Sequence, residues 1–377
     1  MYKQSAVFED HYHYSVGDKK TFNKLQAILW AGESHDTIKY HLPDWLQKLP
    51  IHIEPEQSMK DLCVARARQL REDHDYLRIW FSGGIDSTYM LDTFVDNGIH
   101  IDEIITIGCG IPEADWEVDQ IAIPYLKSLQ DKIPSTKISI QKPTMEDYAN
   151  WYKNGYWFEN YGNIGRSEGF FALRLNRKLQ CVDLHENDKH TANIWGCDKP
   201  FLNYVNGEWY AFALDVDLDW QLGSRTNTSH MFYSEDPLIF TKQCHMLKRG
   251  IIDTIPDKLE YNKVCMGTEY QTLWNASIGR NLKHKKFIIK NTDSIKGHEG
   301  LNYKESLAHK FIAENFPNVY KQFQNGISNL NDINDAKWFN RNNARHGDIG
   351  VFAQFKSIDR NSTKTVDDLY PKGFKIQ

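Results

Sequence analysis

Between residues 76 and 196, short apolar runs alternate with longer stretches in which apolar residues recur every three or four positions. The short runs predict buried β-strands at residues 77–81, 104–107, 137–140 and 192–195. The stretches between them predict helices at residues 86–97, 112–129 and 167–180. Strands that alternate with helices along the chain form parallel sheets, and helices cover both faces of such sheets. We therefore expect an α/β fold with helices on both faces of a parallel sheet.

The regions on either side of this alternation differ from it. Before it, residues 59–71 predict a helix with Leu62, Ala65 and Leu70 on one side. After about Ser234 the strand pattern fades, and helices are predicted from Asp236-Pro237 onward and over residues 302–316.

We accordingly divide the chain into an N-terminal segment, a central α/β domain and a mostly helical C-terminal region. Their predicted bounds are residues 1–75, 76–234 and 235–377. The C-terminal region is expected to contribute to substrate binding or to form a lid.

Composition narrows the classes of protein that this chain can be. The 11 Trp, 19 Tyr and 19 Phe are too much apolar area for a disordered chain. Lys plus Arg number 45 against 50 Asp plus Glu, so the chain lacks the overall basic excess of a dedicated nucleic-acid binder. The six cysteines are scattered singly, which disfavours a disulfide framework, a zinc ribbon and an iron–sulfur cluster.

The expected location is the cytoplasm. No apolar run approaches the ~18 residues that a membrane-spanning helix requires. The N-terminus, Met1-Tyr2-Lys3-Gln4, lacks the apolar stretch of a signal peptide.

The segment from Phe81 to Ser87, F-S-G-G-I-D-S, carries the clearest chemical signal. It joins the first predicted strand to the first predicted helix, at the strand end where ligands bind in open parallel sheets. Two glycines allow a ligand to approach the backbone, and the helix start offers unpaired N–H groups that attract phosphate oxygens. A carboxylate such as Asp86 belongs in an anion site when it holds Mg²⁺, because the metal offsets the repulsion.

Other common motifs do not account for the chain. It has no Gly-Lys dipeptide, so a Walker A loop is excluded, and no G-x-G-x-x-G of a dinucleotide-binding fold. A G-x-S-x-G match at residues 165–169 follows a polar, glycine-broken stretch, whereas a nucleophile elbow needs a buried strand before it. A plain strand–turn–helix corner needs neither both serines nor both glycines of the 82–87 loop.

The S-G-G-I-D-S segment after an apolar strand resembles the PP-loop of the ATP pyrophosphatases, also called the adenine nucleotide alpha-hydrolase group. The arrangement is most similar to the synthetase domain of asparagine synthetase, through residues 65–68 before the loop and residues 105–108 and 112–115 after it. The resemblance implies a Rossmann-like (HUP-type) sheet. It also implies an enzyme that splits ATP between its alpha and beta phosphates, adenylates a carboxylate or carbonyl oxygen, and transfers the activated group to an amine or ammonia.

The resemblance also assigns roles to residues of the first loop and the second strand. Pyrophosphate would be held by Ser82, Gly83, Gly84 and Ser87. Asp86 would hold Mg²⁺ and act in catalysis. The backbone of Ile107 and Gly108 would border the adenine ring.

A second loop, at residues 196–200, follows the fourth predicted strand. The family carries a longer, Gly- and acid-rich loop there, and only Gly196 and Asp198 match it in kind. Asp198 is the candidate for the second metal carboxylate, and Lys199 is the first candidate for a catalytic cation that neutralises pyrophosphate. Further candidate cations are Arg174, Arg177, Lys242 and Lys356.

The chain departs from asparagine synthetase at its start. It begins Met1-Tyr2 rather than with the Met-Cys of a glutaminase domain, and 75 residues are too few for that domain. We therefore expect the nucleophile to be free ammonia, an amine substrate, a sulfur carrier, or a group that a partner protein delivers.

Three other functions remain open. The same loop occurs in enzymes that modify nucleic acids or nucleobases by thiolation or lysidine formation, although the missing Cys pair and basic excess count against that class. The chain could instead be a catalytically silent nucleotide-binding module. A relative of the sulfonucleotide reductases is a remote possibility. The sequence identifies neither the acceptor nor the nucleophile.

Overall fold

A five-stranded parallel sheet organises the fold. The computed structural model describes residues 13–21, 38–41, 51–108, 115–144, 191–196, 200–205, 207–212, 229–261 and 374–376, together with the single or paired residues 30, 34, 110, 146–147, 314 and 317. The strands of the sheet are β4 (Tyr76–Trp80), β5 (Glu103–Ile107), β6 (Lys137–Gln141), β7 (Thr191–Trp195) and β10 (Ser229–Met231). Every neighbouring pair is parallel, which confirms the predicted α/β class.

The order of the strands across the sheet is β10-β7-β4-β5-β6. The chain starts at the central strand β4, adds β5 and β6 on one side, and then crosses to β7 and β10 on the other side. This is the order of doubly wound α/β sheets, in which ligands bind where the strand order reverses. Here the reversal lies between β4 and β7.

The residues of β4 explain why it is the central strand. Leu77, Ile79 and Phe81 are buried on one face of the sheet, and Trp80 is buried on the other face. A strand that is apolar on both sides must be covered on both sides, as parallel sheets are.

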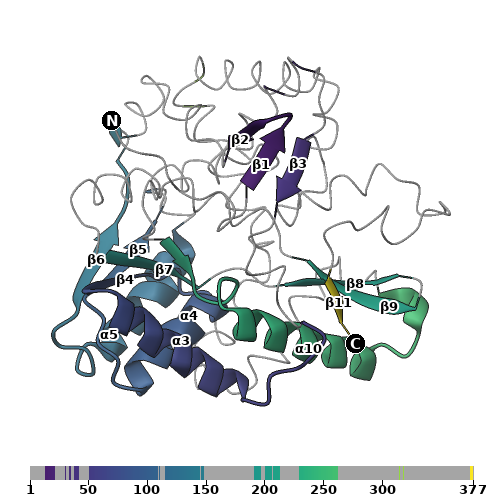
Figure 1. Cartoon of the computed structure of the whole chain (residues 1–377). Coiled ribbons are helices and arrows are strands. Elements are labelled where there is room, and N and C mark those ends of the chain that lie inside the picture. Colours follow the sequence, from purple (N-terminus) through teal and green to yellow (C-terminus); the bar gives the residue numbers. More distant parts are fainter. Residues whose placement is uncertain are drawn as a thin grey trace.

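Helices α3 (Met59–Asp73), α4 (Ile85–Asp96), α5 (Ile123–Leu129) and α10 (Pro237–Thr254) lie on the same side of the sheet (Figure 1). They share one hydrophobic core with the strands, and Phe94 and Phe232 exemplify the contact with ring centroids 5.9 Å apart. The segment before α5 is a short π-helix, η2 (Val118–Ala122), so the helix predicted through residue 129 is interrupted there.

The predicted buried side of α3 is confirmed at Leu62 and Leu70 and was wrong at Ala65. Ala65 is exposed, whereas Cys63, Arg66 and Ala67 are buried with the predicted Leu62 and Leu70. The alanine side chain has little apolar surface to bury. Its place in the sequence therefore indicates little about which side of the helix faces the core. The helix begins at Ser58, whose hydroxyl accepts a hydrogen bond from the Asp61 N–H at 3.2 Å.

The opposite face of the sheet carries a second apolar cluster. The Trp80 and Trp195 rings stack with centroids 4.5 Å apart and planes within 9° of parallel, and Ile105, Ile107 and Met231 complete the cluster. The helix predicted over residues 167–180 lies outside the described residues. Helices on this second face therefore stay a prediction.

The C-terminal part of the described chain packs into the same core. Phe240, Cys244 and Leu247 of α10 belong to the cluster that α3 and the sheet form. The predicted domain bounds stay predictions. The helix predicted over residues 302–316 lies outside the described residues apart from Glu314.

Two smaller antiparallel sheets were not predicted. One contains β1 (His13–Val16), β2 (Lys19–Thr21) and β3 (Ile38–His41) in the order β2-β1-β3. The other contains β8 (Phe201–Val205), β9 (Glu208–Phe212) and β11 (Phe374–Ile376), and its β8–β9 hairpin interrupts the connection from β7 to β10. A short 3₁₀ helix follows α10 at Lys258–Glu260. Within the described part of the chain, no helix is long and apolar enough to cross a membrane.

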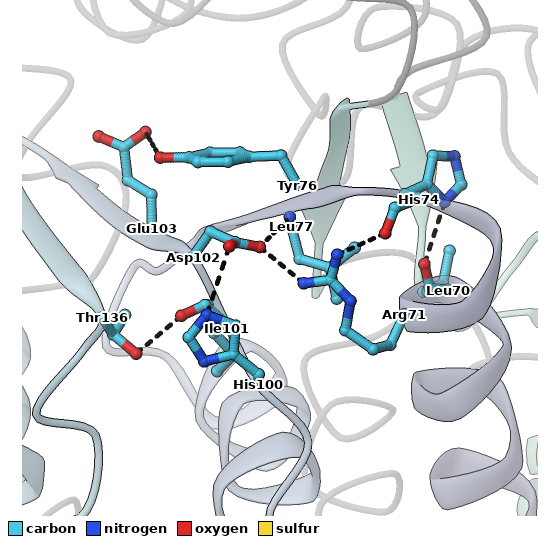
Figure 2. A network of polar contacts seen from close by, with 10 residues as sticks. All are labelled: Leu70, Arg71, His74, Tyr76, Leu77, His100, Ile101, Asp102, Glu103 and Thr136. Carbon is cyan, nitrogen blue, oxygen red and sulfur yellow. Dashed lines mark hydrogen bonds and ion pairs between the residues drawn. The ribbon is translucent and has the colours of Figure 1, made fainter.

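A polar network joins the amino-terminal ends of β4 and β5 to the end of α3 (Figure 2). The Asp102 carboxylate accepts hydrogen bonds from the Leu77 N–H at 2.7 Å and from the Arg71 guanidinium at 2.6 Å. Burial by itself would raise the pKa of Asp102, but these two donors and the Arg71 charge lower it. The network fixes α3 to the amino-terminal end of the sheet. The loops at the reversal of strand order lie at the opposite end, where the strands have their carboxyl ends.

Glu103 is the centre of a second, buried polar network. Its carboxylate accepts hydrogen bonds from Arg78 Nε at 2.8 Å and Ser139 Oγ at 2.8 Å, and it lies 2.9 Å from Lys137 Nζ. Burial would raise the pKa of Glu103, but the bonds from Lys137, Arg78 and Ser139 outweigh it and lower the pKa from 4.5 to about 2. The Glu103 and Arg78 side chains are 4% and 7% exposed, so solvent screens their interaction weakly, whereas Lys137 is 68% exposed and its interaction is screened more.

The Glu103 network predicts an acid-dependent stability. Because the folded pKa is depressed, the stabilisation is complete above the unfolded value of 4.5 and is lost as the pH falls through about 2. The shift corresponds to an upper bound of roughly 3 kcal/mol at neutral pH, because solvent screens the contribution of the exposed Lys137. We expect Glu103→Gln to lower the free energy of unfolding by up to that amount at pH 7, measured by urea denaturation.

The gap between the wild type and Glu103→Gln should narrow steadily between pH 5 and pH 2. Glu72→Gln, which removes an exposed carboxylate of α3, is the matched control and should change stability little at any pH. A gap that stays constant across this range would contradict the assigned role of Glu103.

Candidate functional site

The predicted phosphate loop lies at the carboxyl end of β4, beside the reversal of strand order. The strand pairing continues one residue beyond β4, because the Phe81 N–H donates to the Ile105 carbonyl at 2.8 Å. The chain then turns through Gly83, whose φ of +80° is a conformation that L side chains rarely adopt. Helix α4 begins immediately afterwards, at Ile85.

Hydrogen bonds within the loop fix its shape. Ser82 Oγ and Ser87 Oγ lie 2.9 Å apart, and the Gly84 N–H donates to Ser82 Oγ at 3.2 Å. Ser87 Oγ also donates to the Gly84 carbonyl at 3.0 Å, and it lies 3.3 Å from the backbone nitrogen of Ser82. Ser87 is 3% exposed whereas Ser82 is exposed. Ser87 therefore anchors the loop from inside, and Ser82 presents its hydroxyl at the surface.

The first turn of α4 supplies further donors. Gly84 is the N-cap, and the first helical hydrogen bond runs from the Thr88 N–H to the Gly84 carbonyl at 2.9 Å. The preceding N–H groups of the turn, at Ile85, Asp86 and Ser87, have no acceptor inside the helix. They point out of the helix start together with the positive end of the helix dipole, which favours an anion.

The neighbouring strands β7 and β10 brace this first turn. A Cβ atom on Gly196, which follows β7, would lie 2.8 Å from Ser87 Cα and 3.1 Å from the Asp86 carbonyl oxygen. Tyr233, which follows β10 and is fully buried, donates from its hydroxyl to the same carbonyl at 2.7 Å. Gly196 is therefore a packing residue as well as a predicted site residue. Tyr233 was missed, because β10 has only three residues and gave no strand pattern.

The π-helix η2 packs against the other side of the loop. A Cβ atom on Gly83 would lie 3.1 Å from both Cβ and N of Ala122. Both the backbone conformation of Gly83 and the space around it thus exclude a side chain. π-helical turns are rare and frequently occur near functional sites.

The end of β5 forms the next wall of the site. The Gly108 N–H donates to the Gln141 carbonyl at 2.9 Å, and a Cβ atom on Gly108 would lie 2.7 Å from both carboxylate oxygens of Asp115. Asp115 is 2% exposed and accepts a hydrogen bond from the Gly110 N–H at 3.0 Å. The side chain of Ile107 is buried in the second apolar cluster, so only its backbone can border a ligand.

Lys142 is a cation near the ends of β5 and β6 that the sequence analysis missed. It follows β6, and its Nζ lies 2.8 Å from Asp119 Oδ1 and 3.4 Å from Asp115 Oδ2. Burial opposes its charged form, but the hydrogen bond to Asp119 and the two carboxylate charges raise the pKa of Lys142. Lys199 was ranked first because it lies just beyond a predicted strand. Lys142 also lies just beyond a predicted strand, so the same reasoning could have found it.

Of the other predicted cations, the structure describes only Lys242. Its Nζ donates to the Pro55 carbonyl at 2.9 Å and lies 2.8 Å from Glu54 Oε1. Burial would raise the pKa of Glu54, but its contacts with Arg249 and Lys242 lower it to about 2. Lys242 thus holds the segment before α3, and its predicted role as a catalytic cation stays a prediction. The residues Arg174, Arg177, Asp198, Lys199 and Lys356 lie outside the described residues.

The donors at the loop suit magnesium in kind. Asp86 lies half-buried in the first turn of α4. Mg²⁺ prefers oxygen ligands and usually takes one or two carboxylates in addition to substrate phosphates. Among the described residues, no three His, Cys, Asp or Glu side chains gather as a metal site. The pairing of Asp86 with Asp198 stays a prediction.

Comparison with known proteins adds no assignment, because no protein-family model matches the sequence and no curated protein matches it significantly.

The contact between Gly83 and Ala122 predicts a specific loss of stability. We expect Gly83→Ala to lower the free energy of unfolding by about 1–2 kcal/mol for the left-handed conformation, and further for the clash with Ala122. Gly98→Ala is the matched control, since Gly98 also has a positive φ, +64°, but no atom within 4 Å of the added methyl group. Urea denaturation of both variants isolates the steric part. Equal losses in the two variants would contradict the close packing of Gly83 on η2.

Proposed function

We propose that this protein is an ATP-dependent, AMP-forming ligase of the PP-loop type, built on a Rossmann-like (HUP-type) sheet. It would adenylate a carboxylate or carbonyl oxygen, release pyrophosphate, and transfer the activated group to an amine or ammonia. The observation that carries the proposal is the position of the S-G-G-I-D-S loop. It follows the central strand β4, at the reversal of strand order where doubly wound sheets bind ligands.

The geometry of the loop supports binding of pyrophosphate oxygens. The N–H groups that begin α4 offer several donors within one turn of chain, and the exposed Ser82 hydroxyl would join them by turning its proton from Ser87 Oγ to the ligand. Because Gly83 and Gly84 carry no side chains, a ligand can approach this backbone closely. The contacts from Gly196, Tyr233 and Ala122 hold the donors in place before a ligand arrives. Such preorganised donors stabilise developing charge at little cost of rearrangement.

Magnesium and ATP together would supply an alpha phosphorus open to attack by the acceptor oxygen, with pyrophosphate as the leaving group. The loop of this chain would meet the charge that collects on that leaving group, and Asp86 would hold the metal. A helix start contributes only ~0.3–1 kcal/mol, whereas enzymes lower barriers by about 8 kcal/mol or more. Metal and a further cation must therefore contribute most of the stabilisation, and Lys199 and Lys142 are the candidates.

The walls of the site suggest where the other parts of ATP would lie. The backbone at Ile107 and Gly108 borders the β5 side of the loop and would line the adenine ring. Gly108 has no room for a side chain against Asp115, so this part of the wall stays flat. Lys142 lies beyond it, where it is already paired with Asp115 and Asp119.

The experiment that tests the proposal measures ATP turnover by the full chain with Mg²⁺ against a panel of amino acids, nucleotides and nucleic acids. Chromatography separates AMP plus pyrophosphate from ADP plus phosphate. Acceptor-dependent AMP supports the ligase, and ADP would refute it. Turnover that depends on RNA would favour the alternative of a nucleic-acid modification enzyme. Nucleotide binding without any turnover would indicate a silent nucleotide-binding module.

A substitution at Asp86 tests the role of the loop directly. We expect Asp86→Asn to reduce AMP formation at least 100-fold, since loss of a metal ligand removes charge stabilisation worth several kcal/mol. Asp96→Asn is the matched control, because Asp96 lies in the last turn of the same helix and pairs only loosely with Lys132, 3.8 Å away. It should retain full activity. Circular dichroism checks that both variants are folded, and retained activity of a folded Asp86→Asn would remove Asp86 from the metal role.

A further inference from the structure

Two histidines from distant parts of the chain meet beside the sheet, away from the candidate phosphate loop. His74 follows the end of α3 and His230 lies in the edge strand β10. Their Nε2 atoms are 3.2 Å apart. Their ring centroids are 4.8 Å apart with planes inclined at 65°.

The other ring nitrogens determine which atoms carry protons. His74 Nδ1 lies 3.0 Å from the Leu70 carbonyl oxygen, as Figure 2 shows. A carbonyl oxygen only accepts hydrogen bonds, so this Nδ1 must carry a proton. His230 Nδ1 lies 3.3 Å from Glu235 Oε2, and a carboxylate likewise favours a proton on this nitrogen.

A neutral imidazole has one N–H and one lone pair. With the protons placed on both Nδ1 atoms, each Nε2 turns a lone pair toward the other across 3.2 Å. Two lone pairs repel at this distance, so this pair of tautomers favours a positive ion between the nitrogens, whereas a proton on His230 Nε2 would make the contact an ordinary hydrogen bond. That ion is either a proton or a metal.

The approach of the rings favours a metal over a proton. Because each nitrogen lies on the rim of its ring, a centroid distance of 4.8 Å is too short for two rings that meet head-on across 3.2 Å. A linear N–H···N bond would require that head-on approach. Two metal–nitrogen bonds of about 2.0–2.1 Å span 3.2 Å at an angle of roughly 100° at the metal, close to tetrahedral.

We propose that His74 and His230 bind a divalent transition-metal ion of the zinc type through their Nε2 atoms. Imidazole nitrogen is a preferred ligand of Zn²⁺. No third side-chain ligand joins the pair among the described residues, so water fills the remaining positions. His230 and Glu235 are 19% and 18% exposed, which leaves the ion a path from solvent.

The surroundings of the pair match those of known metal-binding histidines. Such histidines donate their second N–H to a carboxylate or a backbone carbonyl; here the Leu70 carbonyl takes this place for His74, and the Glu235 carboxylate lies 3.3 Å from His230 Nδ1. The Arg66 guanidinium lies 3.5 Å from Glu235 Oε2 and holds the carboxylate in position. A metal here would tie the end of α3 to the edge strand.

The test uses the full chain without an affinity tag, stripped of metal by a chelator and titrated with Zn²⁺ alone. Calorimetry measures stoichiometry and affinity, and thermal unfolding measures the shift in Tm with and without Zn²⁺. We expect His74→Gln and His230→Gln each to lose one bound Zn²⁺ relative to the wild type, and to lose the Tm increase that this ion produces. His52→Gln removes an exposed histidine of the described part and should behave as the wild type.

Glu235→Gln provides a variant that keeps both ligands and does not depend on how well the histidine variants fold. It should bind Zn²⁺ at least 10-fold more weakly than the wild type, because the orienting carboxylate is lost. Equal Zn²⁺ uptake and equal Tm shifts in the wild type and all three variants would overturn the proposal. Absence of Zn²⁺ binding by the wild type would also overturn it, and would assign a shared proton to the pair.

Discussion

The burial of β4 on both faces is the constraint on which the rest of the described structure depends. Its alternate residues enter two separate cores, with Leu77, Ile79 and Phe81 under the helices and Trp80 stacked on Trp195. Such a strand is stable only in the middle of a sheet, with a neighbour on each side. Because the chain fills one side before the other, the strand order reverses next to β4, and the loop that follows β4 lies at that reversal.

Several buried polar side chains of the sheet have hydrogen-bond partners, without which their burial would cost free energy. Glu103 and Arg78 are buried on the face that carries the two tryptophans. Asn193 links this pair to Trp80, because its side-chain oxygen accepts a hydrogen bond from the Trp80 indole at 3.0 Å. Asp102 performs a similar task at the amino-terminal end of the strands (Figure 2). Both networks brace the amino-terminal part of the sheet, opposite the predicted phosphate loop.

The local features of the loop could be predicted from the sequence because they depend on residues that are neighbours in the chain. Two glycines, the strand before them and the helix after them lie within a few positions, and the structure places the turn at Gly83 and the helix start at Ile85. The features that the sequence did not reveal depend on residues far apart in the chain. Tyr233 reaches the Asp86 carbonyl across 147 positions, and Ala122 packs against Gly83 through an unpredicted π-helical turn.

The sequence alone determined the α/β class, the four strands from residue 77 to residue 195, and the strand–loop–helix unit that would hold phosphate. These follow from the period of apolar residues and from glycines placed next to each other, which are properties of short segments. Only the tertiary structure decided the strand order, the exposure of Ala65 on α3, the position of Lys142 beside Asp115 and Asp119, and the meeting of His74 with His230. Contacts of this kind depend on how distant segments pack, and no local pattern records which segments will become neighbours.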